Sequence, residues 1–137
     1  MKTIDPYLIF NGNCRQAMEF YRDCLGAQLN LLTYAEGPGD HPDAVKDKIM
    51  HARLSKGQLV IMASDPHDGK PVTQGNNFFL NLNCESLEEI ERLFNDIAKN
   101  GKVLMPLADM FWGARFGMVT DKFGVNWMFS FELAKHD

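Results

Sequence analysis

The chain has 137 residues, which is enough for one domain with a moderate hydrophobic core. Hydrophobic residues make up 45% of it and charged residues 23%, so the composition excludes a disordered or a fibrous architecture. The formal net charge of -4 argues against a surface for nucleic acid or anionic membrane, because such a surface needs an excess of basic residues. We therefore expect a globular protein whose partners include neither nucleic acid nor membrane.

The N-terminal segment does not have the features of a secretory signal, since residues 1–6 have no long apolar core and include Asp5 and Pro6. No apolar run approaches the length that spans a bilayer. The cysteines are odd in number and lack CxxC spacing, which fits neither a disulfide framework nor a zinc ribbon. They are Cys14, Cys24 and Cys84. These features predict reduced thiols and a cytoplasmic protein.

The first half of the chain predicts a strand, a helix and three further strands. Residues 4–10 are short, apolar and rich in strand formers. Asn13 is a suitable helix N-cap with Gln16 in the capping-box position, and Gly26 ends a run of apolar residues at helical spacing. The further strands are predicted at residues 27–35, 49–55 and 58–64, the last two as a hairpin around Lys56-Gly57.

Two long loops, residues 36–48 and 65–75, separate these strands from their neighbours and are rich in proline, glycine and charge. Loops of this length in a compact domain are often lids or binding segments.

The second half repeats the order of the first. A strand is predicted at residues 76–83, a capping box at Ser86 to Glu89, and a helix that ends at Asn100-Gly101. Three strands follow at residues 103–110, 115–120 and 125–131. The two halves are offset by roughly 70 to 75 positions, and such a repeat is a stronger indication of fold than any single segment. The sequence predicts an α+β fold of two βαβββ modules, about residues 1–70 and 71–137, in a single domain.

Several short stretches carry a resemblance to a known family. They are Glu19-Phe20-Tyr21, Leu25-Gly26, Met50-His51-Ala52, Met105-Pro106-Leu107, Phe111-Trp112-Gly113-Ala114-Arg115 and Asp121-Lys122-Phe123-Gly124. Together they resemble the PhnB-like branch (3-demethylubiquinone methyltransferase-like) of the glyoxalase/bleomycin-resistance/dioxygenase superfamily, also called the vicinal oxygen chelate superfamily. The resemblance implies two βαβββ modules curled into a half-open mixed β barrel, and an active site completed in a homodimer. Methyl transfer is not favoured, because we find no glycine-rich strand-to-helix turn for a nucleotide-like cofactor.

The resemblance also implies where a metal would bind. Metal-dependent members place His, Gln or Glu at four positions on the first, fourth, fifth and eighth strands. In this sequence those positions fall on Pro6, Met62, Asn77 and Met128. A divalent ion needs converging nitrogen or oxygen donors, and only Asn77 could offer one. We therefore predict no metal and no cofactor, while a site made elsewhere by His51, or by loop residues His41 and His67, stays open.

Strand alternation predicts which side chains line a cavity. A tight hairpin at Lys56-Gly57 would place His51 opposite Met62 and Arg53 opposite Val60. Pairing across Lys122-Phe123 would bring Arg115 to the same face as Met128. The predicted lining is His51, Arg53, Met62, Asn77, Phe79, Arg115, Asn126 and Met128, with Trp112 as a pocket wall or a dimer anchor.

This lining suits a small organic molecule, in particular an anion, because arginines and amides stand beside methionine and phenylalanine surface. Imidazole gains and loses a proton near neutral pH, so His51 is the candidate catalytic acid or base; it could equally brace its hairpin. Arg115 is the candidate anion anchor; it could equally be exposed or paired with a partner subunit. The main hypothesis is that the protein binds such a molecule without a metal. One alternative is a glyoxalase-type lyase or isomerase that uses His51 or a relocated metal. The other is a dimeric accessory protein.

Overall fold

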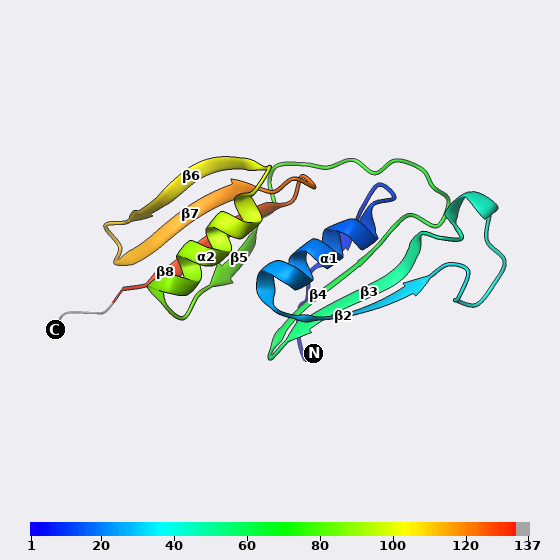
Figure 1. Cartoon of the computed structure of the whole chain (residues 1–137), viewed down its shortest axis with the longest axis horizontal. Helices are drawn as coiled ribbons and strands as arrows, with labels where there is room; N and C mark the ends of the chain where they lie inside the picture. The colour runs from blue at the N-terminus through cyan, green and yellow to red at the C-terminus, as the bar shows by residue number, and fades with distance from the viewer. Residues whose placement is uncertain (134–137) are drawn as a thin grey trace. The chain divides into compact units, whose positions relative to one another are not determined.

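The computed structural model describes residues 1–133, and the chain divides into two compact units, Met1–Thr73 and Gln74–Asp137. In each unit a twelve-residue helix lies on one face of a four-stranded sheet (Figure 1). The two units are described separately below, as unit 1 and unit 2.

Unit 1 contains a sheet with the strand order β1-β4-β3-β2. Strands β1 and β4 are parallel, whereas the β3 pairings with β4 and β2 are antiparallel, so the sheet is mixed. Its elements are β1 Tyr7–Ile9, α1 Cys14–Leu25, β2 Gln28–Thr33, a short 3-10 helix η1 Asp43–Val45, β3 Ile49–Lys56 and β4 Leu59–Ser64.

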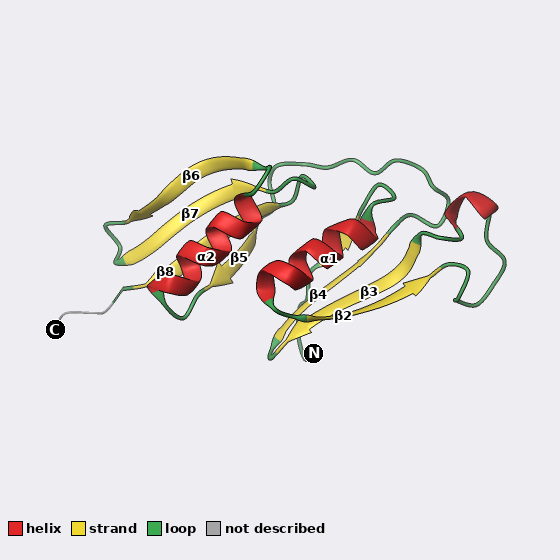
Figure 2. Ribbon diagram, viewed as in Figure 1, coloured by secondary structure: helices red, strands yellow, loops and turns green. Residues whose placement is uncertain are grey.

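Unit 2 repeats this topology with the strand order β5-β8-β7-β6, in which β5 and β8 are the parallel pair (Figure 2). Its elements are β5 Leu80–Asn83, α2 Leu87–Ala98, β6 Lys102–Asp109, β7 Ala114–Thr120 and β8 Asn126–Glu132. The predicted α+β fold of two βαβββ modules is therefore confirmed. Within residues 1–133 the strands form two separate sheets and no closed barrel.

Each helix buries an apolar stripe against its own sheet. Helix α1 packs on β2, β3 and β4, and helix α2 packs on β6, β7 and β8. Buried apolar residues at helical spacing, among them Met18 and Tyr21 in α1 and Ile90 and Phe94 in α2, form these contacts. Gly26 ends α1 in the left-handed conformation, with φ of 64°, as its position after the apolar run predicts. No helix within residues 1–133 is long and apolar enough to cross a membrane.

The first turn of α1 is not capped as the sequence predicts. Asn13 makes no side-chain capping bond; instead the Cys14 amide donates to Asp65 Oδ1 at 3.0 Å. The other carboxylate oxygen, Oδ2, accepts from the Ile49 amide, and the Asp65 carbonyl accepts from Tyr34 Oη. Asp65 is 2% exposed, so this buried carboxylate ties α1 to the sheet.

The first turn of α2 is capped locally. The Ser86 side chain caps it as predicted, while Glu89 accepts from the amide of Glu85 in place of that of Ser86. Ser86 Oγ accepts from the Glu89 amide at 3.0 Å, and the Glu89 carboxylate accepts from the Glu85 amide at 2.9 Å. The helix needs no distant residue for its start.

Both predicted hairpins differ in register from the structure. The β3–β4 turn is Gly57-Gln58, so Arg53 pairs with Met62 instead of Val60, a shift of two residues. An even shift leaves each side chain on its predicted face. The β7–β8 connection has five residues, 121–125, and pairs Thr120 with Asn126. This register differs from the predicted one by a single residue, which moves side chains to the opposite face.

Candidate functional site

Each sheet has one face that its own helix does not cover, called here the helix-free face. On the helix-free face of unit 1 four side chains form a row across the sheet. The strand pairings join Tyr7 to Met62, Met62 to Arg53, and Arg53 to Asn30. The intervening residues Ala52 and Ala63 are buried on the side of α1. The row therefore presents a phenol, a thioether, a guanidinium and an amide together.

His51 lies beside this row, two positions before Arg53 on β3. Its Nδ1 is 3.4 Å from Tyr7 Oη, and the two rings have centroids 5.9 Å apart. The side chain is only partly buried. An imidazole and a phenol in contact can share a proton.

The predicted faces of β3 and β4 are confirmed, because His51, Arg53 and Met62 all lie on the helix-free face. On β1 Tyr7 stands level with Met62, whereas Pro6, the ligand position that the resemblance implies, precedes the strand. In the short strand β1 Leu8 points to the helix side with Ala63, and this alternation is the signal in the sequence that could have placed Tyr7 correctly.

The corresponding row of unit 2 consists mainly of methionines. Pairings join Asn81 to Met128, Met128 to Met118, and Met118 to Met105. Trp127 and Phe129 alternate with Met128 and are fully buried on the side of α2. Three flexible, polarisable thioethers side by side give a surface that can adapt to an apolar or aromatic molecule. The predicted orientation of Met128 is confirmed; Met105 and Met118 were missed.

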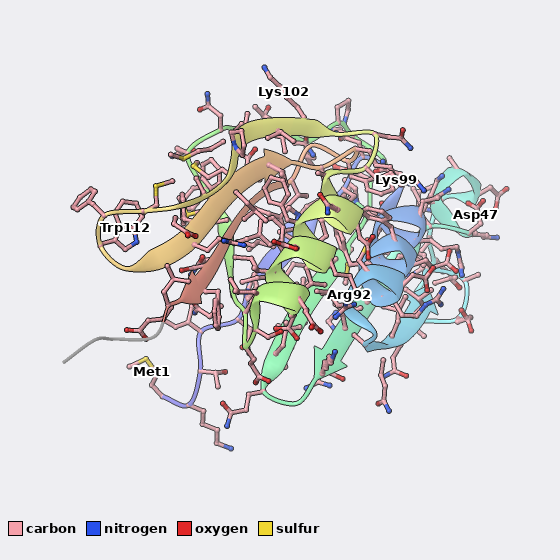
Figure 3. All side chains as sticks on the ribbon, turned by 60° about the vertical axis from the view of Figure 1, so that its left-hand side comes forward. Met1, Asp47, Arg92, Lys99, Lys102 and Trp112 are labelled. Carbon is pink, nitrogen blue, oxygen red and sulfur yellow. The ribbon has the colours of Figure 1, made fainter. Side chains whose placement is uncertain are left out.

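A second row on this face leads to Trp112. It joins Asn83 to Ser130, Ser130 to Phe116, and Phe116 to Ala108. Trp112, at the tip of the β6–β7 hairpin (Figure 3), has its ring 5.9 Å from that of Phe116.

A cavity of about 380 Å³ adjoins this second row. Trp112, Asn83, Ser130 and Glu132 line it together with Cys84. Burial raises the pKa of the Cys84 thiol to about 11, so this cysteine is a poor nucleophile at neutral pH.

Three other residues of the predicted lining of unit 2 lie outside these two rows. Asn126 is 8% exposed and bonded within the protein: its Oδ1 accepts from Thr120 Oγ1 at 2.7 Å and its Nδ2 donates to the Phe78 carbonyl. Asn77 and Phe79 lie before β5, which begins at Leu80, so no strand pairing fixes their faces. Asn126 therefore supports the turn between β7 and β8.

The predicted orientation of Arg115 is wrong. Arg115 pairs with Phe131 and alternates with Phe116, so it lies on the same side of β7 as Gly117 and helix α2. A Cβ atom added to Gly117 would lie 2.7 Å from the Phe94 ring, which confirms that α2 covers this side.

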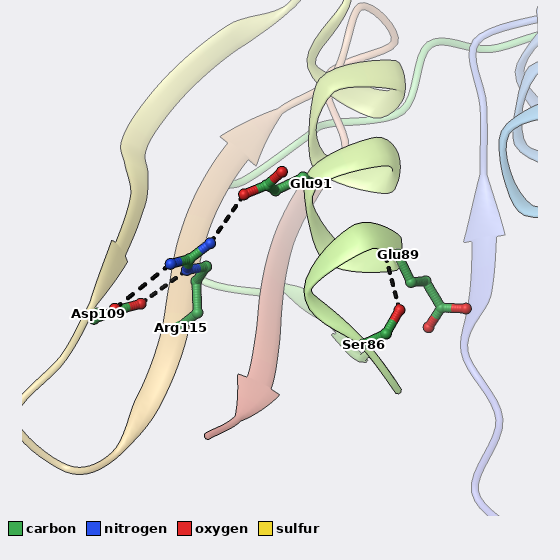
Figure 4. A network of polar contacts seen from close by, with 5 residues as sticks. All are labelled: Ser86, Glu89, Glu91, Asp109 and Arg115. Atoms are coloured by element: carbon green, nitrogen blue, oxygen red, sulfur yellow. Dashed lines mark hydrogen bonds and ion pairs between the residues drawn. The ribbon is translucent and has the colours of Figure 1, made fainter. Parts of the chain in front are cut away.

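Two carboxylates surround the Arg115 guanidinium (Figure 4). Nε donates to Asp109 Oδ1 at 2.8 Å, and one terminal nitrogen donates to Glu91 on α2 at 2.9 Å. The hydrogen bond from Arg115 lowers the pKa of Asp109. Arg115 thus links α2 to the β6–β7 hairpin, and its cationic charge is already paired within the unit.

Apart from His51, the side chains of the rows described above are poor metal ligands. Among residues 1–133 no group of three or more His, Cys, Asp or Glu side chains could hold a metal ion. The pairing positions closest to the expected ligand positions carry Tyr7, Met62, Asn81 and Met128. None of them is His or a carboxylate, the donors that Zn²⁺, Mn²⁺ and Fe²⁺ sites use most. That the protein works without a metal stays a prediction.

Comparison with known proteins identifies clear relatives. The sequence profile of the glyoxalase/bleomycin resistance protein/dioxygenase superfamily matches residues 3–129. Protein YjdN of Escherichia coli strain K12 is 37% identical over 137 residues, covering 91% of this chain and 92% of that protein. The crystal structure of protein PA1353 from Pseudomonas aeruginosa is 47% identical, with a TM-score of 0.89, and covers 98% of this chain and 100% of its own. A PhnB protein from Bacillus cereus is 28% identical, with a TM-score of 0.77 over 95% and 99% of the two chains.

Proposed function

Because this chain belongs to the glyoxalase/bleomycin resistance protein/dioxygenase superfamily and is similar to a PhnB protein, we propose that it binds a small organic anion on the helix-free face of unit 1 without a divalent metal. The observation that carries the proposal is the row across the sheet of this unit. It consists of Tyr7, Met62, Arg53 and Asn30.

The chemistry of this row supports a ligand with an anionic group and an apolar or aromatic body. The Arg53 guanidinium is exposed on its face and can donate charge-assisted hydrogen bonds to a carboxylate, sulfonate or phosphate. The Met62 sulfur and the Tyr7 ring, neighbours in the same row, can pack against a ring of the ligand. Asn30 adds an amide group at the end of the row.

The binding proposal can be tested with 8-anilinonaphthalene-1-sulfonate, an aromatic anion whose fluorescence reports an apolar environment. We expect Arg53→Gln to weaken its binding about tenfold, the usual effect of losing a charge-assisted hydrogen bond. Arg15→Gln is the matched control, because Arg15 is an exposed arginine on α1, the helix that covers the opposite face of the same sheet. Equal affinities of the two variants would exclude Arg53 as the anion-binding group, and absence of binding to the unmodified protein would refute the proposal for this ligand class.

The absence of a metal requirement has a separate test. Protein purified without chelators should contain far less than one nickel, zinc, iron or manganese ion per chain by elemental analysis. Its affinity for the same probe should not change in EDTA. One metal ion per chain, or loss of probe binding in EDTA, would overturn the metal-free proposal. Neither result would decide the role of Arg53, which the Arg53→Gln variant tests separately.

The contact between Tyr7 and His51 favours a second candidate function, a glyoxalase-type lyase or isomerase with His51 as its base. The Tyr7 hydroxyl, 3.4 Å from Nδ1, would orient the imidazole or pass on its proton. The assay uses the hemithioacetal that methylglyoxal forms with glutathione. If turnover is found, His51→Gln should reduce kcat by about 10²-fold, whereas a protein that only binds should lose little affinity. No turnover by the unmodified protein, with or without added divalent metal, would exclude this activity.

We propose a homodimer as the functional form. The support is an apolar tip on the β6–β7 hairpin, where Phe111 is 97% exposed and Trp112 54% exposed. Exposed aromatic residues of this kind are typical anchors of interfaces between subunits. Sedimentation at micromolar concentration should give twice the chain mass, and Phe111→Ser should lower the dimer fraction. A monomer at that concentration would refute the proposal.

A further inference from the structure

Unit 1 contains a cavity of about 300 Å³ that none of the functional assignments above uses. It lies between the loop that contains η1 and the loop that follows β4, and its lining includes no residue of the row Tyr7, Met62, Arg53 and Asn30. The lining combines two lysines, Lys48 and Lys70, with the apolar residues Ala44, Val45, Pro66 and Pro71. We propose that this cavity is a second binding site, for a small organic carboxylate with a short apolar body.

The loop after β4 is held in a defined shape. The Val72 amide donates to Asn11 Oδ1 at 2.6 Å, and Asn11 Nδ2 donates to the Val72 carbonyl. Asn11 thereby fixes the far end of the loop to the segment before α1. Within the loop the Lys70 amide donates to Asp68 Oδ1 at 3.0 Å, a local turn that sets the direction in which the chain presents Lys70.

The opposite wall is also ordered. Val45, at the end of η1, is 2% exposed and anchors this loop in the core of the unit. The Lys48 amide donates to the Val45 carbonyl, and Lys48 Nζ donates to the Gly12 carbonyl at 3.1 Å. These bonds place one ammonium group at the cavity before any ligand arrives, which reduces the entropy that binding must overcome.

The charge balance of the lining favours an anion. It contains two ammonium groups and one carboxylate, Asp65. That carboxylate is buried, and each of its oxygens already accepts a backbone hydrogen bond, from Cys14 and from Ile49. An ammonium group has three donors, and the bond from Lys48 Nζ to the Gly12 carbonyl uses one of them. The lysines can therefore donate to a ligand, whereas the Asp65 oxygens are occupied by structural bonds.

Size and polarity define the ligand class further. A volume near 300 Å³ is at the lower end of the range for small-molecule sites, so the cavity suits a molecule of a few heavy atoms. The proline, alanine and valine side chains cannot hydrogen-bond and would leave a fully polar ion partly unsolvated. A carboxylate on a short hydrocarbon chain satisfies both the lysines and the apolar wall.

The test is a titration of the ¹⁵N-labelled full-length protein with butyrate, followed through its amide NMR shifts. We expect the largest shifts at residues 11–12, 44–48 and 66–71, with millimolar affinity, about 4 kcal/mol. Butyramide, the neutral isostere, should bind at least tenfold more weakly. Inorganic phosphate should also bind more weakly than butyrate, because it has no apolar body.

Lys70→Gln should weaken butyrate binding about tenfold. Lys46→Gln is the matched control, since Lys46 is an exposed lysine of the same region that does not line this cavity. Lys70 is exposed, so its substitution should not disturb the fold. Equal binding of butyrate and butyramide, equal effects of the two lysine substitutions, or shifts confined to other residues would each overturn the proposal. Phosphate binding as tight as that of butyrate would show that the apolar wall plays no part and would overturn the assigned ligand class.

Discussion

Units 1 and 2 have the same strand order and the same pairing directions, but different side chains stabilise them. In unit 1 the first turn of α1 depends on Asp65, 51 positions later in the chain. In unit 2 the first turn of α2 depends on Ser86, three positions from the amide that it caps. The repeat therefore conserves backbone topology, while the means of satisfying buried polar groups differs between the two copies.

Unit 2 also has a buried aspartate, with a different task. Asp121, 3% exposed, accepts from the Phe123 and Val125 amides through Oδ1 and from Trp127 Nε1 through Oδ2. It thus shapes the turn before β8, whereas Asp65 joins a helix to a sheet. A buried carboxylate requires several hydrogen bonds. Asp65 accepts them from two backbone amides, and Asp121 from two backbone amides and the Trp127 indole.

The helix-free faces differ in the same way. Unit 1 presents His51, Arg53 and Tyr7, whereas unit 2 presents a row of methionines. The helix-free face of unit 1 is therefore polar, whereas that of unit 2 is apolar and polarisable. Four variants test these contrasts, beginning with the largest expected effect.

Asp65→Ala should destabilise unit 1 strongly. It leaves the buried amides of Cys14 and Ile49 without their acceptors, and hydrogen bonds to charged groups contribute about 1.5–3 kcal/mol each. We expect a loss of about 3 kcal/mol or more in the free energy of unfolding, measured in urea by circular dichroism. Asp65→Asn, which keeps one acceptor oxygen, should lose less. A loss no greater than that of Ser86→Ala would contradict the central role of Asp65.

Gly117→Ala tests the observed register of unit 2. The new Cβ would lie 2.7 Å from Phe94 and 2.9 Å from Leu107, so we expect a loss of about 1–3 kcal/mol from overpacking. Met118→Ala is the control on the helix-free face and should cost less, since Met118 is only partly buried. If Gly117→Ala did not change stability, this glycine would have to face away from α2. That result would support the register predicted from the sequence, in which Arg115 lies on the helix-free face.

Ser86→Ala should reduce stability by about 1 kcal/mol, the usual cost of losing an N-cap side chain. Asn13→Ala, at the matching position of α1, should be almost neutral because Asn13 makes no capping bond. Urea unfolding of both variants measures the contrast. Similar losses in the two would mean that the helices are capped alike.

Arg115→Gln should have the smallest effect, and that effect should depend on pH. The paired Asp109 has a folded-state pKa below its ordinary value, so its contribution is present above the unfolded pKa and is lost as pH falls through the folded pKa. The Tm difference between Arg115→Gln and the unmodified protein should therefore be larger at pH 7 than at about pH 3. A Tm difference that is larger at acid pH would contradict the ion pair between Arg115 and Asp109. If Arg115→Gln also bound anilinonaphthalene sulfonate more weakly, Arg115 would have to be a ligand-binding residue.

The sequence by itself determined the repeated βαβββ order, the extent of α1 and the faces of β3 and β4. These features follow from local periodicity, because side chains alternate with period 2 in strands and recur near 3.6 in helices. His51, Arg53 and Met62 were placed correctly for this reason. The even shift of two residues in the β3–β4 hairpin did not disturb their alternation.

Only the tertiary structure decided the side on which Arg115 lies, the residue that caps α1 and the position of Tyr7 level with Met62. The β7–β8 connection has five residues because Asp121 folds it around its own carboxylate, and an odd change in loop length reverses the face of a whole strand. The hydrogen bond from the Cys14 amide to Asp65 joins residues far apart in sequence, so no local sequence pattern predicts it. Periodicity fixes alternation within an element, whereas register and distant polar contacts depend on how the elements meet.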